Sequence, residues 1–157
     1  MVDEKAKLII LGSMPGVESL RQNQYYAHKR NQFWDIIYGV FDEEKEEKYS
    51  DRVKFLNKKN IALWDVIKQC EREGSLDANI RNEEMNNLKD FFNKYTNIQY
   101  VLFNGTTAKR LFKKYIGFNV PTITNYYQLP STSPANTRPF KEKLQKWMII
   151  KELLCNI

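Results

Sequence analysis

Side chains that commonly bind metal ions are scarce in this sequence. It has two cysteines, Cys70 and Cys155, which lie far apart, and one histidine, His28. This set cannot supply the four ligands of a structural zinc site or the four thiolates of an iron–sulfur cluster. We therefore expect a protein that works without a metal ion.

Long apolar segments are also missing. No hydrophobic run approaches the length of a membrane span, and only a short apolar run follows Met1-Val2-Asp3-Glu4-Lys5 in place of a signal-peptide core. We therefore expect a cytoplasmic protein with no membrane partner. The length fits one domain, residues 1–157, and no internal repeat is visible. We expect that domain to be a monomer.

Positive charge is concentrated in the last third of the chain. Residues 105–157 hold nine Lys or Arg against two Glu, a net charge of +7, while the whole chain carries +6. Clustered basic side chains favour a polyanionic partner, because Lys and Arg neutralise phosphates. An ordinary solvated helix face is the alternative, and charge alone does not decide between the two.

Short apolar runs alternate with amphipathic segments along the chain. The runs predict buried strands at 8–11, 61–64, 98–103 and 120–129, the last interrupted at Asn125. Helices are expected at 31–41, from 53, at 84–95, at 106–115 and from 139, with a surface segment at 42–52 and a loop at 71–82. The alternation predicts an α/β protein with three layers, α/β/α, around a four-stranded, mainly parallel sheet.

Polar and glycine-rich residues follow each expected strand. They are Gly12–Gly16, Asp65, Asn104-Gly105 and the loop 130–136, which two prolines keep out of regular structure. The carboxyl ends of parallel strands lie at one edge of a sheet, where ligands bind in open α/β folds. We expect these four segments to face one cleft.

Four segments in order carry a resemblance to a known family. They are Gly12-Ser13-Met14-Pro15-Gly16, Tyr26-Ala27-His28, Asn31-Gln32-Phe33-Trp34 and Leu129-Pro130-Ser131-Thr132-Ser133-Pro134-Ala135-Asn136. Together they resemble the uracil-DNA glycosylase superfamily. A further stretch, Leu63-Trp64-Asp65-Val66 with Cys70, Arg72 and Gly74-Ser75-Leu76-Asp77, resembles its hypoxanthine-excising branch, the deoxyinosine glycosylases.

The resemblance implies a reaction on double-stranded DNA that contains a damaged base, with no metal and no other cofactor. The base leaves the stack, enters a pocket, and loses its N-glycosidic bond to water through an oxocarbenium-like state. The third residue of the first motif is usually Asn or Asp, but here it is Met14, which can neither activate nor orient a water. In the hypoxanthine branch the catalytic asparagine maps instead to Asn31. Lys29 stands where that segment usually has proline.

The resemblance also assigns the base-binding pocket. It implies that Gly12, Ser13, Met14 and Pro15 form the pocket floor, that Tyr26 stacks on the base and that His28 donates to it. Each has an ordinary alternative: Asn31 as a helix N-cap, Tyr26 in the core, and His28 in a structural hydrogen bond. Asp65 and Asp77 are candidates for the pocket or for helix caps.

The loop 130–136 is the candidate DNA contact. Residues 134–136 are placed to press into the space left by the flipped nucleotide, and the group expected to bind DNA is Ser131, Thr132, Ser133, Pro134, Asn136 and Arg138. A polar loop between a strand and a helix is the alternative.

We expect a DNA repair glycosylase that removes hypoxanthine. No lysine is marked for Schiff-base chemistry, so we expect a monofunctional enzyme. One alternative is a glycosylase specific for uracil or for G:T/U mismatches, which Met14 disfavours. The other is a non-catalytic, flavodoxin-like module that binds a nucleotide or phosphate, although the loop lacks the Gly-Lys-Ser/Thr ending of a P-loop.

Overall fold

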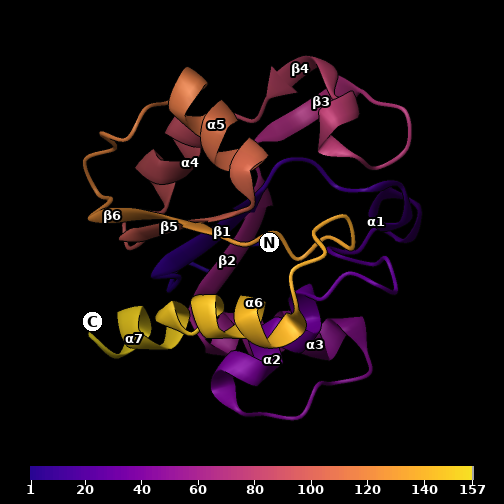
Figure 1. Cartoon of the computed structure of the whole chain (residues 1–157). Coiled ribbons are helices and arrows are strands. Elements are labelled where there is room, and N and C mark those ends of the chain that lie inside the picture. Colours follow the sequence, from indigo (N-terminus) through magenta and orange to yellow (C-terminus); the bar gives the residue numbers. More distant parts are fainter. Residues whose placement is uncertain (157) are drawn as a thin grey trace.

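A parallel sheet of four strands forms the centre of the computed structural model, which describes residues 1–156 (Figure 1). The strands are β1 (Leu8–Gly12), β2 (Ile61–Asp65), β5 (Tyr100–Asn104) and β6 (Asn125–Leu129). Their order is β2-β1-β5-β6, and every neighbouring pair is parallel. The predicted four-stranded sheet is confirmed.

Strand β1 needs an unbroken apolar run because it lies in the middle of the sheet. Successive side chains point to opposite faces of a sheet, and both faces of β1 are covered. Leu8 and Ile10 pack into one hydrophobic cluster, while Ile9 and Leu11 pack into the other. All five residues of β1 are buried.

Helices cover both faces of the sheet, so the predicted three layers are confirmed (Figure 1). One face carries α2 (Phe33–Phe41), α3 (Tyr49–Lys58), α6 (Phe140–Trp147) and α7 (Ile149–Cys155). The other carries α4 (Leu88–Lys94) and α5 (Thr106–Tyr115). A short helix, α1 (Val17–Gln22), follows the loop after β1.

A β-hairpin replaces part of the predicted loop and helix. Strands β3 (Ile67–Glu71) and β4 (Arg81–Met85) pair antiparallel, and a single 3₁₀ turn, η1 (Asp77–Asn79), lies in their connection. The helix predicted from residue 84 is therefore wrong at its start. Residues 84 and 85 pair with β3, and α4 begins only at Leu88.

Other boundaries differ in smaller ways. Helix α1 was not expected, α3 begins at Tyr49 inside the segment expected to be a surface connector, and residues 120–124 precede β6 instead of belonging to it. The expected last helix is divided into α6 and α7. Within residues 1–156, no helix has the length and apolar character needed to cross a membrane.

Candidate functional site

A cleft of about 900 Å³ lies at the carboxyl edge of the sheet. The loops after β1, β2, β5 and β6 all line it, as the parallel strand order predicts. It brings together most of the predicted site residues, namely Gly12, Ser13, Met14, Pro15, Tyr26, His28, Asn31, Ser131, Thr132, Ser133, Pro134 and Asn136. Arg138, the remaining one, is exposed just beyond the lining of this cleft.

Gly12 is required at the floor because two side chains approach its backbone. A Cβ at this position would lie 2.6 Å from Asp65 Oδ1 and 3.3 Å from the Tyr26 hydroxyl. A distance of 2.6 Å from Asp65 Oδ1 is too short for a real Cβ atom, so any larger residue at position 12 would displace the buried Asp65 carboxyl group. The glycine therefore brings the ends of β1 and β2 together with Tyr26.

Asp65 places a carboxyl group at the base of the cleft. The residue is only 7% exposed, yet it contributes to the cleft lining. Burial raises the pKa of Asp65 to about 7, and the Asp77 carboxylate adds to the rise while the Arg72 guanidinium opposes it. Near neutral pH this group is therefore divided between a neutral acid, which donates a hydrogen bond, and a carboxylate, which only accepts.

Tyr26 is held in an unusual backbone conformation. Its φ is 54°, in the left-handed region that non-glycine residues rarely adopt. Its neighbours fix the segment: Tyr25 N–H donates to the Tyr49 hydroxyl (3.1 Å), and Ala27 N–H donates to Ser19 Oγ (3.1 Å). The Tyr26 ring stacks on the buried Phe33, with centroids 4.0 Å apart. Strain sustained in this way is common at ligand-binding sites.

His28 is exposed at the rim of the cleft. Its Nδ1 accepts a hydrogen bond from Arg30 N–H (3.1 Å). A neutral imidazole that accepts at Nδ1 carries its proton on Nε2. The local contact therefore leaves the ring with an N–H donor for another partner.

Asn31 lies directly before Gln32, the N-cap residue of helix α2, and also lines the cleft. Its Oδ1 accepts from Phe33 N–H (2.9 Å), the first residue of the helix. The alternative of Asn31 as the N-cap residue is therefore wrong by one position, although its side chain does accept from the first N–H group of the helix. The side-chain amide has no such bond and is free to donate, while a second lone pair remains on Oδ1.

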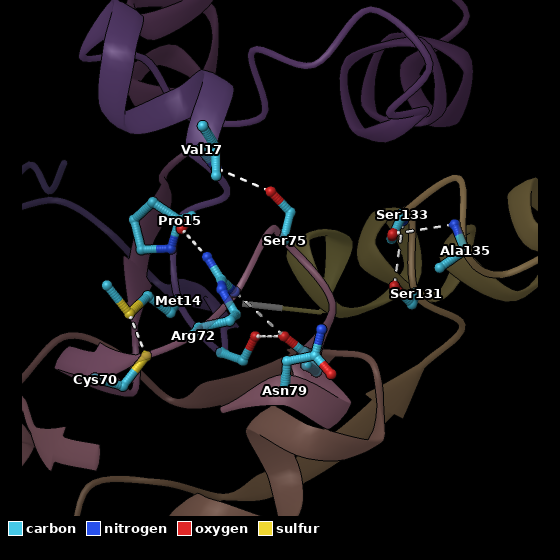
Figure 2. A network of polar contacts seen from close by, with 12 residues as sticks. Met14, Pro15, Val17, Cys70, Arg72, Ser75, Asn79, Ser131, Ser133 and Ala135 are labelled. Carbon is cyan, nitrogen blue, oxygen red and sulfur yellow. Dashed lines mark hydrogen bonds and ion pairs between the residues drawn. The ribbon is translucent and has the colours of Figure 1, made fainter. Parts of the chain in front are cut away.

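The connection between β3 and β4 fixes the loop after β1 (Figure 2). Ser13 Oγ donates to Asp77 Oδ1 (2.7 Å), and the Arg72 guanidinium donates to Pro15 O (2.5 Å). Ser75 Oγ accepts from Val17 N–H (3.0 Å). These bonds tie together two segments about sixty residues apart in the sequence, so the pocket floor depends on the hairpin.

Met14 belongs to the same junction. The Cys70 thiol contacts its thioether sulfur (3.0 Å, Figure 2), and the side chain packs against the cluster on the α5 side of the sheet. Its position places a soft apolar surface on the floor of the cleft, where a carboxylate or amide would otherwise bind water.

Asn104 anchors the loop 130–136 to the end of β5. Its side chain donates to Thr132 Oγ1 (3.0 Å) and accepts from Thr132 N–H (2.9 Å), and both residues are buried. This burial disfavours the expected phosphate contact of the Thr132 hydroxyl, because the residue is 0% exposed and its oxygen accepts from Asn104. Thr132 is an anchor, and its neighbours Ser131 and Ser133 are the half-buried hydroxyls of the loop.

The family model described as the uracil DNA glycosylase superfamily matches residues 1–154. The chain belongs to this superfamily. As a DNA glycosylase it hydrolyses N-glycosyl bonds and takes DNA as its substrate. The alternative of a non-catalytic, flavodoxin-like module is thereby set aside.

Relatives of this superfamily member cover nearly its whole length. The hypoxanthine DNA glycosylase of Methanosarcina barkeri is 33% identical over 150 residues, which are 94% of this chain and 91% of the relative. That of Methanosarcina acetivorans is also 33% identical, over 148 residues, with the same shares covered. A solution NMR structure provisionally described as a uracil DNA glycosylase, also from Methanosarcina acetivorans, matches with a TM-score of 0.81 and 32% identity. That match covers 97% of this chain and 93% of the other.

Lys143 is a residue of this glycosylase whose place the sequence did not indicate. It belongs to the basic C-terminal third, yet it is only 1% exposed. Its ammonium group donates to Gln32 Oε1 and to Asn136 O, both at 2.8 Å. Burial lowers the pKa of Lys143, and nearby Arg138 lowers it further. The lysine thus joins the segment that carries Asn31 to the loop expected to contact DNA.

Arg72 and Asp65 also have structural roles that the sequence left open. The resemblance to the hypoxanthine branch included both residues but assigned neither a partner. In the glycosylase fold Asp65 caps no helix and faces the cleft, while the 5%-exposed Arg72 side chain holds the first loop. Among residues 1–156, no cluster of three His, Cys, Asp or Glu side chains is arranged to hold a metal ion.

Proposed function

We propose that this superfamily member removes hypoxanthine from double-stranded DNA by hydrolysis of the bond between base and deoxyribose. The observation that carries the proposal is the combination of Met14 with the polar groups around it. Met14 cannot hold the attacking water, whereas Asn31, His28 and Asp65 line the same cleft. Two relatives named hypoxanthine DNA glycosylase support the choice of base.

The leaving base accumulates negative charge as the glycosidic bond breaks, so donors aimed at its edge lower the barrier. His28 offers Nε2–H from the rim, and the Asn31 amide offers a second donor. In its neutral form Asp65 both donates and accepts, which matches the adjacent N1–H and O6 of hypoxanthine. We propose that Asp65 recognises this edge of the base, and that Asn31 either positions the attacking water or contacts the base.

The remaining groups hold the flipped nucleotide. Tyr26 presents an aromatic ring whose far face is supported by Phe33, and stacking on such a ring stabilises a base by about 1–3 kcal/mol. Ser131, Ser133 and Arg138 are the groups we assign to the DNA backbone. Pro134 and Asn136 complete the surface of that loop.

The reaction is proposed to stop at the abasic site. A lyase step needs a lysine amine beside the sugar to form a Schiff base. No lysine lines the cleft in the part of the chain that is described, and the nearby Lys143 is engaged with Gln32 and Asn136. A monofunctional, monomeric enzyme is the form we propose.

The test is a strand-scission assay on duplexes that carry deoxyinosine, deoxyuridine or a G·T mismatch, with hot alkali to cleave abasic sites. We expect product from deoxyinosine only after alkali treatment. Asn31→Ala should lower its single-turnover rate by about 100-fold, within the range for loss of a positioned polar group. The exposed Asn79→Ala, outside the cleft lining, is the control. Release of uracil alone would reject the hypoxanthine assignment, and breakage without alkali would reject the monofunctional one.

A further inference from the structure

The cleft contains two carboxyl groups in different surroundings. The Asp77 side chain is 40% exposed, accepts from Ser13 Oγ (2.7 Å) and lies 3.8 Å from the Arg72 guanidinium. Figure 2 shows this guanidinium at the carbonyl of Pro15. Asp65, at the end of β2, is only 7% exposed. Active sites that use one carboxyl group as an acid separate it in this way from a second one in a polar environment.

The carboxyl group of Asp65 has no hydrogen-bond donor within residues 1–156. The residue is bonded through its backbone, where its carbonyl oxygen accepts from the Asn86 amide (2.8 Å). Its Oδ1 faces the backbone of Gly12, which the Tyr26 hydroxyl also approaches, and the residue contributes to the cleft lining. Because a buried polar group without a partner costs free energy, this carboxyl group is arranged for a partner that enters the cleft.

The surroundings of Asp65 favour its protonated form. The groups that interact with it electrostatically come from four segments of the chain, and they are Met1, Tyr25, Tyr26, Arg72 and Asp77. Burial is the largest influence on the pKa of Asp65; the Met1 ammonium and Arg72 guanidinium groups oppose the rise, and the Asp77 carboxylate adds to it. Burial also raises the pKa of both tyrosine hydroxyls, so they stay neutral. The carboxyl group therefore keeps a proton at pH values where an exposed aspartate has lost it.

The departure of a purine requires a place for negative charge. As the bond between N9 and C1′ breaks, its electron pair enters the purine ring and spreads to O6 and the ring nitrogens. A neutral carboxyl group beside O6 can supply a proton at that moment, whereas a carboxylate would repel the developing charge. The other oxygen of the same group accepts from N1–H and holds the base in place.

We propose that Asp65 is the general acid of this reaction and transfers its carboxyl proton to O6 of the leaving base. The bond between N9 and C1′ breaks, O6 gains the proton, and the base leaves as a neutral hydroxyl tautomer that returns to the keto form in solvent. Water adds to C1′ and releases one proton, and solvent restores the proton of Asp65. This role rests on the proposed function and adds a chemical step to the recognition assigned to Asp65 there.

Asp65→Asn separates proton transfer from recognition. The amide still donates to O6 and its carbonyl still accepts from N1–H, but the amide cannot give up a proton. Binding to a duplex with 2′-fluorodeoxyinosine, which resists cleavage, should stay within about twofold of the wild type, while single-turnover excision of hypoxanthine at pH 6 should slow by about 100-fold. The exposed Asp42→Asn, outside the cleft lining, is the control.

The pH dependence of excision gives a second readout. The wild-type rate should fall by about tenfold or more between pH 6 and pH 8.5, because only the protonated carboxyl group acts. Asp65→Asn should lose this fall. His28→Gln should be slower at every pH and should keep the fall, since the ring of His28 lies at the rim and is not the proton donor.

A duplex that carries 2′-deoxynebularine tests the atom that accepts the proton. This purine has hydrogen in place of O6, so its excision by the wild type should be slow, and Asp65→Asn should excise it at about the same rate. Equal rates on this substrate would also show that the variant is folded.

Different results overturn the acid role and the proposed function. A wild-type rate on deoxyinosine that does not change with pH, or an Asp65→Asn rate equal to the wild type at pH 6, would overturn the acid role and leave the proposed function intact. A fall that disappears in His28→Gln would assign the proton to His28 instead, and a loss of binding as large as the loss of rate would reduce Asp65 to recognition. No release of hypoxanthine at any pH would reject the proposed function, and the acid role with it.

Discussion

At the scale of single residues, the ionisation of Asp65 joins the chemistry of the cleft to the stability of the fold. The carboxyl group is buried, and its pKa of about 7 lies well above the value of 3.8 for an exposed aspartate. Between these two pH values the unfolded chain releases a proton that the folded chain keeps. The contribution of Asp65 to the free energy of unfolding must therefore fall as the pH rises from about 4 to about 7.

This dependence predicts the behaviour of Asp65→Asn. The amide has the shape of the neutral acid but no titration, so the variant should lose less stability than the wild type between pH 4 and pH 8. The difference should reach roughly 2–4 kcal/mol, since one pKa unit corresponds to about 1.4 kcal/mol. Urea unfolding at several pH values measures it, with Asp51→Asn at a partly exposed position on α3 as a control. Parallel curves for wild type and Asp65→Asn would show that the carboxyl group is not held neutral.

The sequence predicted which residues line the cleft better than it predicted what each of them does there. Asn31, Tyr26 and His28 followed from the resemblance, and the structure gathers them around the cleft. The burial of Thr132 and Lys143 could not be predicted, because each depends on a partner far away in the sequence, Asn104 and Gln32. In the sequence Lys143 is only one of the basic residues of the C-terminal third; the packed structure supplies its two acceptors.

At the scale of elements, the hairpin β3–β4 controls the shape of the pocket floor. The Arg72 side chain is 5% exposed and reaches the carbonyl of Pro15. Arg72→Leu leaves that carbonyl and Asp77 without their cation, so the variant should lose about 1–3 kcal/mol of stability. Its excision rate should fall about tenfold because the loop after β1 is no longer fixed.

Hydrogen exchange at residues 13–17, measured together with single-turnover excision, checks this prediction. Exchange should become faster in Arg72→Leu, while the exposed Lys68→Gln on β3, which loses only an ion pair with Glu84, should resemble the wild type. Unchanged exchange combined with slower excision would mean that Arg72 acts on the substrate directly.

The hairpin β3–β4 is the part of the fold that local sequence patterns did not predict. Strands β1, β2 and β5 are apolar because helices cover both faces, so their runs are visible in the sequence. Strands β3 and β4, IKQCE and RNEEM, are mostly polar and exposed. Their pairing is a contact between distant residues, and the helical spacing of Met85, Leu88 and Phe92 concealed the end of β4.

At the scale of the whole molecule, the cleft is assembled from the two ends of the fold. The segment with Asn31 follows the first strand, and the loop 130–136 follows the last. Gln32 N–H donates to Thr132 O (3.0 Å), and Lys143 binds both Gln32 and Asn136. A single buried ammonium group on α6 therefore couples the proposed catalytic segment to the proposed DNA contact.

Lys143→Met should remove the link between the segment that carries Asn31 and the loop 130–136. Methionine keeps much of the volume of the side chain but leaves the acceptors of the half-buried Gln32 and Asn136 without this donor, which should cost about 1–3 kcal/mol of stability. Because both loops shift, kcat on deoxyinosine DNA should fall and KM should rise together. Lys146→Met, at an exposed position further along α6, should change neither. Steady-state kinetics with urea unfolding separates the possibilities: a stability loss with wild-type kcat and KM would make Lys143 a support of the fold alone, with no part in aligning the two loops.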